Sequence, residues 1–555
     1  MMGSIFFEIT VIVCLAAFLA IIFRALKQPT ILAYILTGII IGPLGLFEVN
    51  NQEVFQTMAE LGITFLLFMV GLELKLKDLQ SVGRVALLTG IGQILFTSFF
   101  GYLICLALGF SPLTSLYISV ALTFSSTIII VKLLSDKKDL NSLYGKISVG
   151  FLLVQDFFAI LALILLSGFN QESLSVLTFA AIVLKALVLF AVIIYLSKSI
   201  LPRLVDKISH SGEILFLFSI AWVFGMAAFV SSPIVGFSIE IGGFLAGLAL
   251  ANSSENFQIV ARVRALRDFF ITIFFVILGM KMVFSNASVI LPPAILLSLF
   301  VLIGNPLIVI AIMSLMGFRR RTAFLAGLTV AQISEFSLIV VFMGNKIGHL
   351  SSEVISLVTV VGVITFTFST YMIVNGNKLY KLLNPYLKIF ERKHTKGEQT
   401  GIVGEFSGHA ILIGANRTGE AILNEYKDLT NEVVVVDFDP DVVKGLKDKG
   451  FIALFGDISD PDIQEKAQVD KAKIIISTVP DLEDNLFLLG ALKPENRKVK
   501  VVVVAQDRNE AKSLYKAGAD YVVIPNLSAG RYIAKIIKED IDVIESHKLT
   551  DLSYL

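Results

Sequence analysis

Long runs of apolar residues, separated by charged residues, glycine or proline, follow one another from the start of the chain to about residue 375. Each run has roughly 17–25 residues, the length that a helix needs to cross the hydrocarbon core of a bilayer. The thirteen predicted spans have the approximate limits 5–23, 30–46, 57–74, 85–109, 112–134, 147–168, 176–200, 213–231, 233–251, 269–285, 289–316, 322–345 and 351–374. This pattern predicts an α-helical membrane domain over residues 1–375.

A different pattern begins after this domain, where short apolar runs alternate with amphipathic segments. Such alternation is typical of a parallel α/β fold in which each run is a buried strand. The predicted strands are residues 410–413, 433–436, 453–455, 474–477, 499–504 and 521–524. We therefore expect a membrane domain at 1–375, a linker at 376–407, an α/β domain at 408–530 and a tail at 531–555.

Composition and charge predict a multi-pass membrane protein. Hydrophobic residues make up 55% of the 555 positions and charged residues 16%, and the mean hydropathy of +0.81 is too high for a wholly soluble protein. Lysine and arginine are concentrated on alternate loops, whereas the opposite loops carry only Lys281 and Lys346. The positive-inside rule predicts that the N-terminus is outside and that, after an odd number of spans, the C-terminal domain is cytoplasmic in a plasma or inner membrane.

The charge balance and the cysteines argue against two classes of site. The net charge of +1 does not indicate a nucleic-acid partner, because the basic residues lie at membrane edges and in a mixed-charge domain. Cys14 and Cys105 both lie inside apolar spans, so neither a disulfide framework nor a cysteine metal site is supported.

The sixth span contains an acid in its middle, in the pair Gln155-Asp156. A carboxylate at the centre of a membrane helix costs ~2.5–3.5 kcal/mol on an insertion scale, so such a residue is by default a site for an ion or a proton. The alternative is that Asp156 is buried and hydrogen-bonded to a neighbouring helix for packing alone.

Polar residues also interrupt the fifth and twelfth spans at mid-depth. The fifth contains Thr123, Ser125, Ser126 and Thr127, and the twelfth contains Gln332-Ile-Ser-Glu335. Broken helices at corresponding positions of two halves indicate a midplane binding site between inverted repeats, here with the seventh span as the linker. The hydroxyls would coordinate a dehydrated alkali cation or satisfy backbone groups freed by unwinding, or they form a helix contact only. Glu335 either neutralises the positive end of a half-helix or lines the ion path.

These motifs, together with Arg267-Asp-Phe-Phe and Phe274-Phe-Val-Ile-Leu-Gly279, resemble the monovalent cation:proton antiporter-2 family over residues 5–374. The Gln-Asp pair is similar to the Kef-type potassium efflux branch of that family. The resemblance implies a homodimer in membrane lipid, with a mobile core domain and a dimerisation domain in each copy. It also implies K+/H+ exchange by alternating access, with Na+/H+ exchange as the alternative, and no enzymatic activity.

The exchange chemistry would take place at Asp156. Burial disfavours the charged carboxylate whereas a bound cation favours it, so a proton and K+ or Na+ would compete for one group. A single exchanged carboxylate would make turnover electroneutral. Relatives in the resembled family that have two adjacent acids, or a lysine in the eleventh span, can be electrogenic. This chain has Gln155 and Asn305 at these places, and the resemblance therefore implies electroneutral exchange.

A nucleotide motif follows the first predicted strand of the α/β domain. The strand ends in Gly414-Ala-Asn416-Arg417-Thr418-Gly419, and Asp437 closes the next strand. A strand, a glycine turn, a helix start and an acid after the second strand together predict a Rossmann site. Gly414 would permit the tight turn and Gly419 the close helix packing, while helix amides would hold phosphate and Asp437 would bind ribose.

The α/β domain resembles the N-terminal module of regulators of potassium conductance (RCK), whose ligands include AMP, ADP, ATP and NAD(H). Asp457 and Thr478 match later positions of that module. Asn416 replaces the middle glycine, whose role is to let the backbone approach a pyrophosphate, so AMP, ADP or ATP is favoured over NAD as a regulatory ligand. The alternative is an empty Rossmann scaffold used for dimerisation.

Two other classes of protein share single features with this chain. A dehydrogenase would add a convergent set of His, Tyr/Lys or Cys to the nucleotide loop, but the histidines here are scattered over loops and termini. A potassium channel would need a carbonyl-lined filter segment such as Thr-Val-Gly-Tyr-Gly, which the sequence lacks. A transporter without a catalytic cofactor is therefore the predicted class.

Overall fold

A computed structural model describes most of the 555-residue chain. The described residues are 5–45, 51–73, 83–137, 139–140, 142–167, 176–209, 211–233, 235–253, 255–282, 287–318, 320–387, 406–415, 418–425, 433–437, 440–456, 458, 461–479, 482–492 and 499–539. They belong to two compact units, which divide near residue 392. Each unit is described by itself.

The first unit is helical. Its helices are α1 (Ile5–Ala25), α2 (Thr30–Ile41), α3 (Gln52–Glu73), α5 (Gly83–Ala107), α6 (Pro112–Ala121), α7 (Thr127–Asp136), α8 (Leu143–Ser167), α9 (Val176–Ser199), α10 (Leu201–Ile208), α11 (Gly212–Val230), α12 (Ile239–Leu250), α13 (Asn256–Met280), α14 (Ala287–Leu299), η1 (Phe300–Gly304), α15 (Asn305–Leu315), α16 (Arg320–Leu328), α17 (Glu335–Lys346), α18 (Ser352–Val374) and α19 (Gly376–Leu387). Each of the thirteen predicted spans overlaps one helix or one interrupted run of helices. Among the described residues, seven helices are long and apolar enough to cross a membrane by themselves, or eight if one bent pair is counted as a span.

The helices of the two halves pack in the same way, as expected for inverted repeats. Three helix contacts each have a counterpart when the two halves are exchanged. The contact of α1 with α2 corresponds to that of α11 with α12, and the contact of α2 with α13 corresponds to that of α12 with α3. The contact of α5 with α6 corresponds to that of α15 with α16. Corresponding helices are seven predicted spans apart in the sequence. The pairing of helices agrees with the predicted repeat, in which α9 is the linker between the two halves.

Close glycine contacts occur in both halves too. A Cβ on Gly38 of α2 would lie 1.9 Å from the carbonyl oxygen of Val276 in α13, and a Cβ on Gly247 of α12 would lie 2.0 Å from that of Phe68 in α3. Any larger residue would push these backbones apart. Small residues let membrane helices approach closely, so the same kind of contact joins both corresponding helix pairs.

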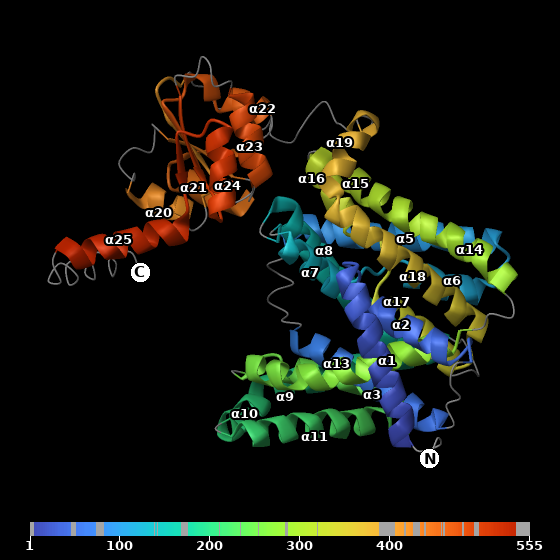
Figure 1. Ribbon diagram of the computed structural model, residues 1–555. Helices are drawn as coiled ribbons and strands as arrows, with labels where there is room; N and C mark the ends of the chain where they lie inside the picture. The colour runs from blue at the N-terminus through green and yellow to red at the C-terminus, as the bar shows by residue number, and fades with distance from the viewer. Residues whose placement is uncertain are drawn as a thin grey trace. The chain divides into compact units, whose positions relative to one another are not determined.

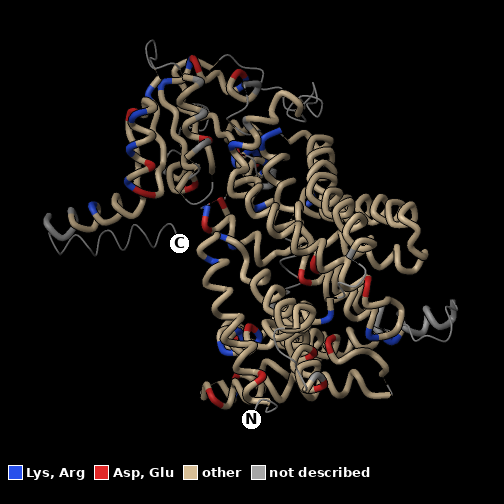
Figure 2. Tube along the Cα trace, turned by 45° about the vertical axis from the view of Figure 1, so that its right-hand side comes forward, with Lys and Arg blue, Asp and Glu red and all other residues tan. Residues whose placement is uncertain are grey.

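The membrane helices form two bundles. The scaffold bundle contains α1, α2, α3 and α9 to α13, and the core bundle contains α5 to α7 and α14 to α18. The core bundle also contains α8, which is hydrogen-bonded to α5 and α7. Figure 1 shows α3, α11 and α13 apart from α5, α6 and α14. Lysine and arginine gather near the ends of the membrane helices (Figure 2). A charged residue inside a bundle is therefore an exception to this distribution, and its local contacts have to be described.

The second unit is a parallel sheet with connecting helices. Its strands are β1 (Ala410–Ile413), β2 (Val433–Asp437), β3 (Ile452–Phe455), β4 (Ile474–Ser477), β5 (Lys500–Val504) and β6 (Tyr521–Val523), and its α-helices are α20 (Thr418–Glu425), α21 (Pro440–Asp448), α22 (Pro461–Lys466), α23 (Leu482–Ala491), α24 (Arg508–Lys516) and α25 (Pro525–Glu539). The strand order is β3-β2-β1-β4-β5-β6, and every pair is parallel. All six predicted strands are confirmed to within one residue at each end. The order reverses between β1 and β4, the position where Rossmann folds bind ligands.

The segment predicted as a linker begins with a helix, α19. This helix packs on α16 through the rings of Phe324 and Tyr380, whose centroids are 5.7 Å apart. Arg320 also donates a 3.2 Å hydrogen bond to Asn384 in α19. The membrane unit therefore continues past residue 375.

Candidate functional site

Both predicted broken spans are interrupted helices in the structure. Residues 122–126 separate α6 from α7, and residues 329–334 separate α16 from α17. Ser126 caps α7 by accepting a 3.4 Å hydrogen bond from the N–H of Ile129, and Ser334 caps α17 in a capping box. These caps satisfy backbone amides that have no water partner inside a membrane.

Asp156 lies in the middle of α8, beside the first interruption. Its Oδ2 atom accepts a 2.9 Å hydrogen bond from the hydroxyl of Thr127, the first residue of α7. The N-terminal end of a helix carries a partial positive charge, which stabilises a carboxylate. Asp156 is partly exposed whereas Gln155 is fully buried. Asp156 is therefore the more accessible member of the Gln-Asp pair.

A chain of neutral hydrogen-bonding groups ties the first interruption to α8 and α5, and it begins at Gln155. The Oε1 atom of Gln155 accepts from the backbone N–H of Ser125 at 3.1 Å, and its Nε2 atom donates to Oε1 of Gln93 at 2.7 Å. Nε2 of Gln93 then lies 3.2 Å from the carbonyl oxygen of Thr123 and 3.1 Å from the hydroxyl of Thr97. The unwound segment is therefore held on both sides by side-chain amides.

The chain continues to Asn305 in the eleventh span. The hydroxyl of Thr97 donates to Oδ1 of Asn305 at 3.1 Å, and Nδ2 of Asn305 donates to the carbonyl oxygen of Leu122 at 3.2 Å. Asn305 is buried and follows the π-helical turn η1, a distortion that often marks functional positions in helices. A neutral amide therefore satisfies the carbonyl end of α6 without adding charge to the site.

The predicted hydroxyls of the first interruption have different partners. Thr123 donates to the carbonyl oxygen of Val120 at 2.7 Å, Ser126 caps α7, and Thr127 binds the carboxylate. The hydroxyl of Ser125 is fully buried and has no hydrogen-bond partner among the described residues. A buried oxygen without a partner is costly, and a dehydrated cation would satisfy it.

Glu335 is the first residue of α17, at the second interruption. Its side chain is buried, and its Oε2 atom accepts a 3.2 Å hydrogen bond from the hydroxyl of the capping residue Ser334. Gln332 in the same interruption accepts from Ser369 of α18 at 2.6 Å. Glu335 therefore lies where a negative charge complements the helix dipole, in the position that corresponds to Thr127 of α7.

Gln93 and Thr97 belong to the site but were not predicted from the sequence. Both are polar residues of the fourth predicted span, and their spacing of four places them on one face of α5. That spacing is the signal by which they could have been found. Their partners, however, come from α8, from α15 and from the interruption between α6 and α7, and follow only from the packing.

The glycine loop of the second unit lies between β1 and α20, at the switch point of the sheet. Gly414 has a φ of +82°, which favours glycine, and a Cβ on Gly419 would lie 2.0 Å from the carbonyl oxygen of Gly414. A tight turn and a close approach of helix to strand therefore need glycine at these two positions, as predicted.

Asp437 and Thr478 hold this loop. Oδ2 of Asp437 accepts a 2.7 Å hydrogen bond from the N–H of Ala415, and the Thr478 hydroxyl donates to the carbonyl oxygen of Gly414 at 2.8 Å. Thr418 is the exposed first residue of α20. The other predicted nucleotide residues, Asn416, Arg417 and Asp457, lie outside the described residues. The described part of the loop fits a Rossmann phosphate cradle.

Two family models match this chain. Residues 12–375 match the sodium/hydrogen exchanger transmembrane family, and residues 410–525 match the TrkA-N domain. The chain belongs to the sodium/hydrogen exchanger family. It is a cation:proton antiporter of the membrane with a cytoplasmic TrkA-N domain, and the antiporter class predicted from its motifs is confirmed.

Known relatives and solved structures agree with this assignment. The antiporter is 26% identical over 542 residues to the putative cation/proton antiporter YbaL of Escherichia coli, covering 94% of this chain and 95% of that protein. It is 25% identical over 503 residues to the glutathione-regulated potassium-efflux system protein KefC of Escherichia coli, covering 88% and 78%. The sodium proton antiporter MjNhaP1 from Methanocaldococcus jannaschii has a similar fold, with a TM-score of 0.51, 17% identity, and coverage of 69% of this chain and 97% of that chain.

Proposed function

We propose that this antiporter exchanges K+ for H+ at Asp156, electroneutrally and as a homodimer in the membrane. The observation that carries this proposal is the hydrogen bond from Thr127 to Asp156, because it places a reachable carboxylate at the N-terminal end of a broken helix. A half-helix end that faces a carboxylate at mid-depth would allow an ion to bind there and to be released to either side.

Proton and cation exclude each other at this carboxylate. The ionised form of Asp156 binds the cation, with the unpartnered hydroxyl of Ser125 as a candidate second oxygen ligand. Protonation removes the negative charge, so the cation leaves and the neutral carboxyl group carries the proton in the opposite direction. One proton replaces one cation, and no net charge crosses the membrane.

The choice of K+ is supported by the potassium-efflux relative KefC, which covers both units of the chain. Na+ is the second candidate, supported by the fold of a sodium proton antiporter. The neutral chain from Gln155 to Asn305 supports electroneutral exchange, because it provides no second titrating group beside Asp156.

The TrkA-N domain is proposed to bind an adenine nucleotide and thereby to regulate exchange. Support comes from the positive φ of Gly414, the close packing of Gly419 and the position of the loop at the switch point of the sheet. Backbone amides at the start of α20 would hold phosphate, and Asp437 would contact ribose as well as the loop.

The test is a transport assay in proteoliposomes that contain a pH-sensitive dye. Addition of K+, Na+, Li+ or no cation to separate samples reports which cation drives proton movement, with protein-free liposomes as the control. We expect the largest response with K+. A larger response with Na+ would overturn the choice of cation, and equal responses with and without cation would overturn exchange itself.

A further inference from the structure

Lys281 and Lys346 are the two lysines on loops that the positive-inside rule places outside the membrane. Lys346 is the last residue of α17 in the core bundle, and Lys281 follows α13 in the scaffold bundle. The structure brings both of them to the boundary between the two bundles, where each contacts the opposite bundle.

Lys346 reaches from the core bundle to two acids of the scaffold bundle. Its Nζ atom lies 2.8 Å from Oε1 of Glu60 in α3 and 3.6 Å from Oε1 of Glu240 in α12. The side chain of Glu240 is fully buried, and its carboxylate has no hydrogen-bond partner among the described residues. A buried charge is strongly destabilised when its counter-charge is removed, so Glu240 depends on Lys346.

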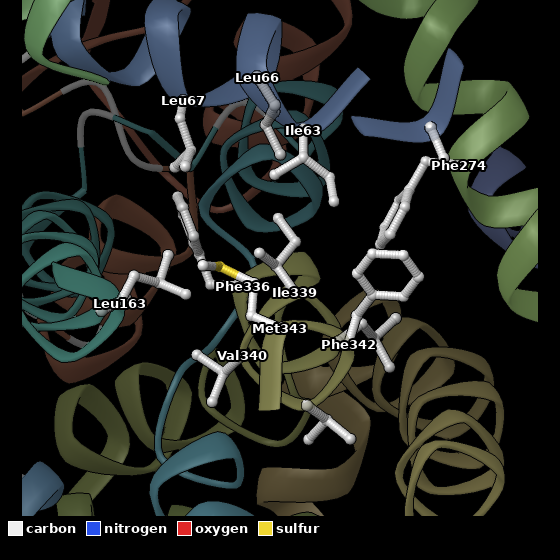
Figure 3. Packing of buried hydrophobic residues seen from close by; sticks show 14 of the residues in the cluster. Ile63, Leu66, Leu67, Leu163, Phe274, Phe336, Ile339, Val340, Phe342 and Met343 are labelled. Carbon is white, nitrogen blue, oxygen red and sulfur yellow. The ribbon is translucent and has the colours of Figure 1, made fainter. Parts of the chain in front are cut away.

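Lys281 crosses the same boundary in the other direction. Its Nζ atom lies 4.8 Å from the ring centroid of Phe342 in α17, a cation–π contact. Apolar side chains from both bundles also meet at this boundary (Figure 3). They are Ile63, Leu66 and Leu67 of α3, Phe274 of α13, and Phe336, Ile339, Val340, Phe342 and Met343 of α17. Phe274 meets Phe342 edge to face, at 5.6 Å between centroids.

The lysine contacts and the apolar contacts at the boundary resist movement of the two bundles in different ways. Apolar surfaces can repack in a new register, because the hydrophobic effect has no direction. The lysine contacts join single atoms across the boundary, and they are lost when α17 moves along α3 and α12. The conformation in this structure is therefore the one that both external lysines favour.

We propose that Lys346, with Glu240 and Glu60, and Lys281, with Phe342, form an outer latch between the core and scaffold bundles. The latch closes the boundary in the conformation described and opens once in each exchange cycle. This inference rests on antiport by alternating access, which needs the core to move against the scaffold. It assigns a role in the cycle to four charged residues that do not bind the transported ion.

Reversible cross-linking tests whether the boundary opens. The first cysteine pair, Lys346→Cys with Glu240→Cys, allows a cross-link between core and scaffold. The control pair, Glu60→Cys with Glu240→Cys, allows a cross-link between two scaffold helices. Both pairs are made in a background with Cys14→Ser and Cys105→Ser. A bis-methanethiosulfonate reagent should reduce cation-driven proton movement at least tenfold in the first pair, with recovery after reduction, and leave the second pair unchanged. Undiminished exchange in a first pair shown by mass to be cross-linked would overturn the latch.

Labelling tests the latch without relying on transport. Ile63→Cys lies in the buried apolar layer, so a membrane-impermeant maleimide added from outside reports how often the boundary opens. Glu240→Gln, which keeps the shape of the side chain, should increase the labelling rate severalfold, while the exposed Glu53→Gln should not change it. Equal labelling rates in Ile63→Cys alone, with Glu240→Gln and with Glu53→Gln would overturn the latch. The labelling rate does not depend on the identity of the cation or on Asp156.

Discussion

The hydroxyl of Thr127 lies 2.9 Å from Oδ2 of Asp156 and donates a hydrogen bond to it. This contact joins the start of the half-helix α7 to the middle of α8. The neighbouring Gln155 accepts a hydrogen bond from the backbone N–H of Ser125, which lies within the interruption. Consecutive residues of α8 therefore fix both the carboxylate and the unwound segment, so the site depends on two helices rather than on one acid.

We expect Asp156→Asn to abolish cation-driven proton movement while the protein stays folded. The amide neither titrates nor carries the charge that binds a cation, yet it has nearly the same shape. Dye dequenching in proteoliposomes measures the loss, and thermal melting in detergent measures folding. The matched control is Glu53→Gln, an exposed acid of α3 that should keep full activity. Normal exchange in a folded Asp156→Asn protein would contradict the assignment.

Thr127→Val should weaken apparent cation affinity roughly 10–100-fold, because a hydrogen bond to a charged group contributes about 1.5–3 kcal/mol. The hydroxyl stabilises the ionised carboxylate, which is the form that binds the cation. Thr127→Ser retains the hydroxyl and should behave nearly as the original protein. The measurement is the concentration of K+ that gives half-maximal dequenching. If the Val and Ser variants are alike, the contact does not contribute to cation binding.

Gln93→Leu should destabilise the protein and slow exchange. It leaves the Nε2 donor of Gln155 and the carbonyl oxygen of Thr123 without these partners, and each buried unsatisfied group costs about 1–3 kcal/mol. The exposed Gln258→Leu is the control. Combining Gln93→Leu with Gln155→Leu tests the link: the two losses in melting temperature should be less than additive, because both variants break the same chain. Full additivity would show that the two amides act independently.

The spans and strands could be predicted from the sequence because they follow from local patterns. Long apolar runs have few alternatives in a bilayer, and short β-branched runs between glycines are strands in most contexts. The interruptions at Ser125 and Glu335 were visible as polar residues in apolar runs. The partners were not visible, since Gln93 meets Gln155, and Lys346 meets Glu240, only after distant helices pack. Pairings of this kind depend on tertiary structure rather than on local sequence.

Exchange should be electroneutral, so an imposed membrane potential should leave its rate unchanged. The reason is that Asp156 has a neutral neighbour in Gln155 and the eleventh span offers the amide of Asn305. Gln155→Asp is the informative variant, because a second acid beside the first raises one pKa of the pair by repulsion and should alter the pH profile. Voltage-dependent exchange in the unmodified protein would show that another charge moves during the cycle.

Nucleotide binding should depend both on the charge of Asp437 and on its hydrogen bond to the loop, and two substitutions separate these contributions. Asp437→Asn keeps an oxygen that accepts from the N–H of Ala415 but loses the charge, whereas Asp437→Ala removes the loop contact as well. Calorimetry on the full-length protein should therefore show weaker AMP or ATP binding in the Asn variant and a larger loss in the Ala variant. Basal exchange should persist in both, because the site at Asp156 lies in the other unit.

The transport effect of the nucleotide should be lost in parallel with its binding. A ligand can shift a conformational equilibrium only by its differential affinity for the two states, typically ~1–3 kcal/mol. We therefore expect a modest change in exchange rate with AMP or ATP in the unmodified protein and none in Asp437→Ala. NAD should bind no more tightly than AMP, because Asn416 replaces the glycine that admits a pyrophosphate. Tight NAD binding without AMP binding would overturn the ligand choice, whereas no binding of any nucleotide would leave the domain as a dimerisation scaffold.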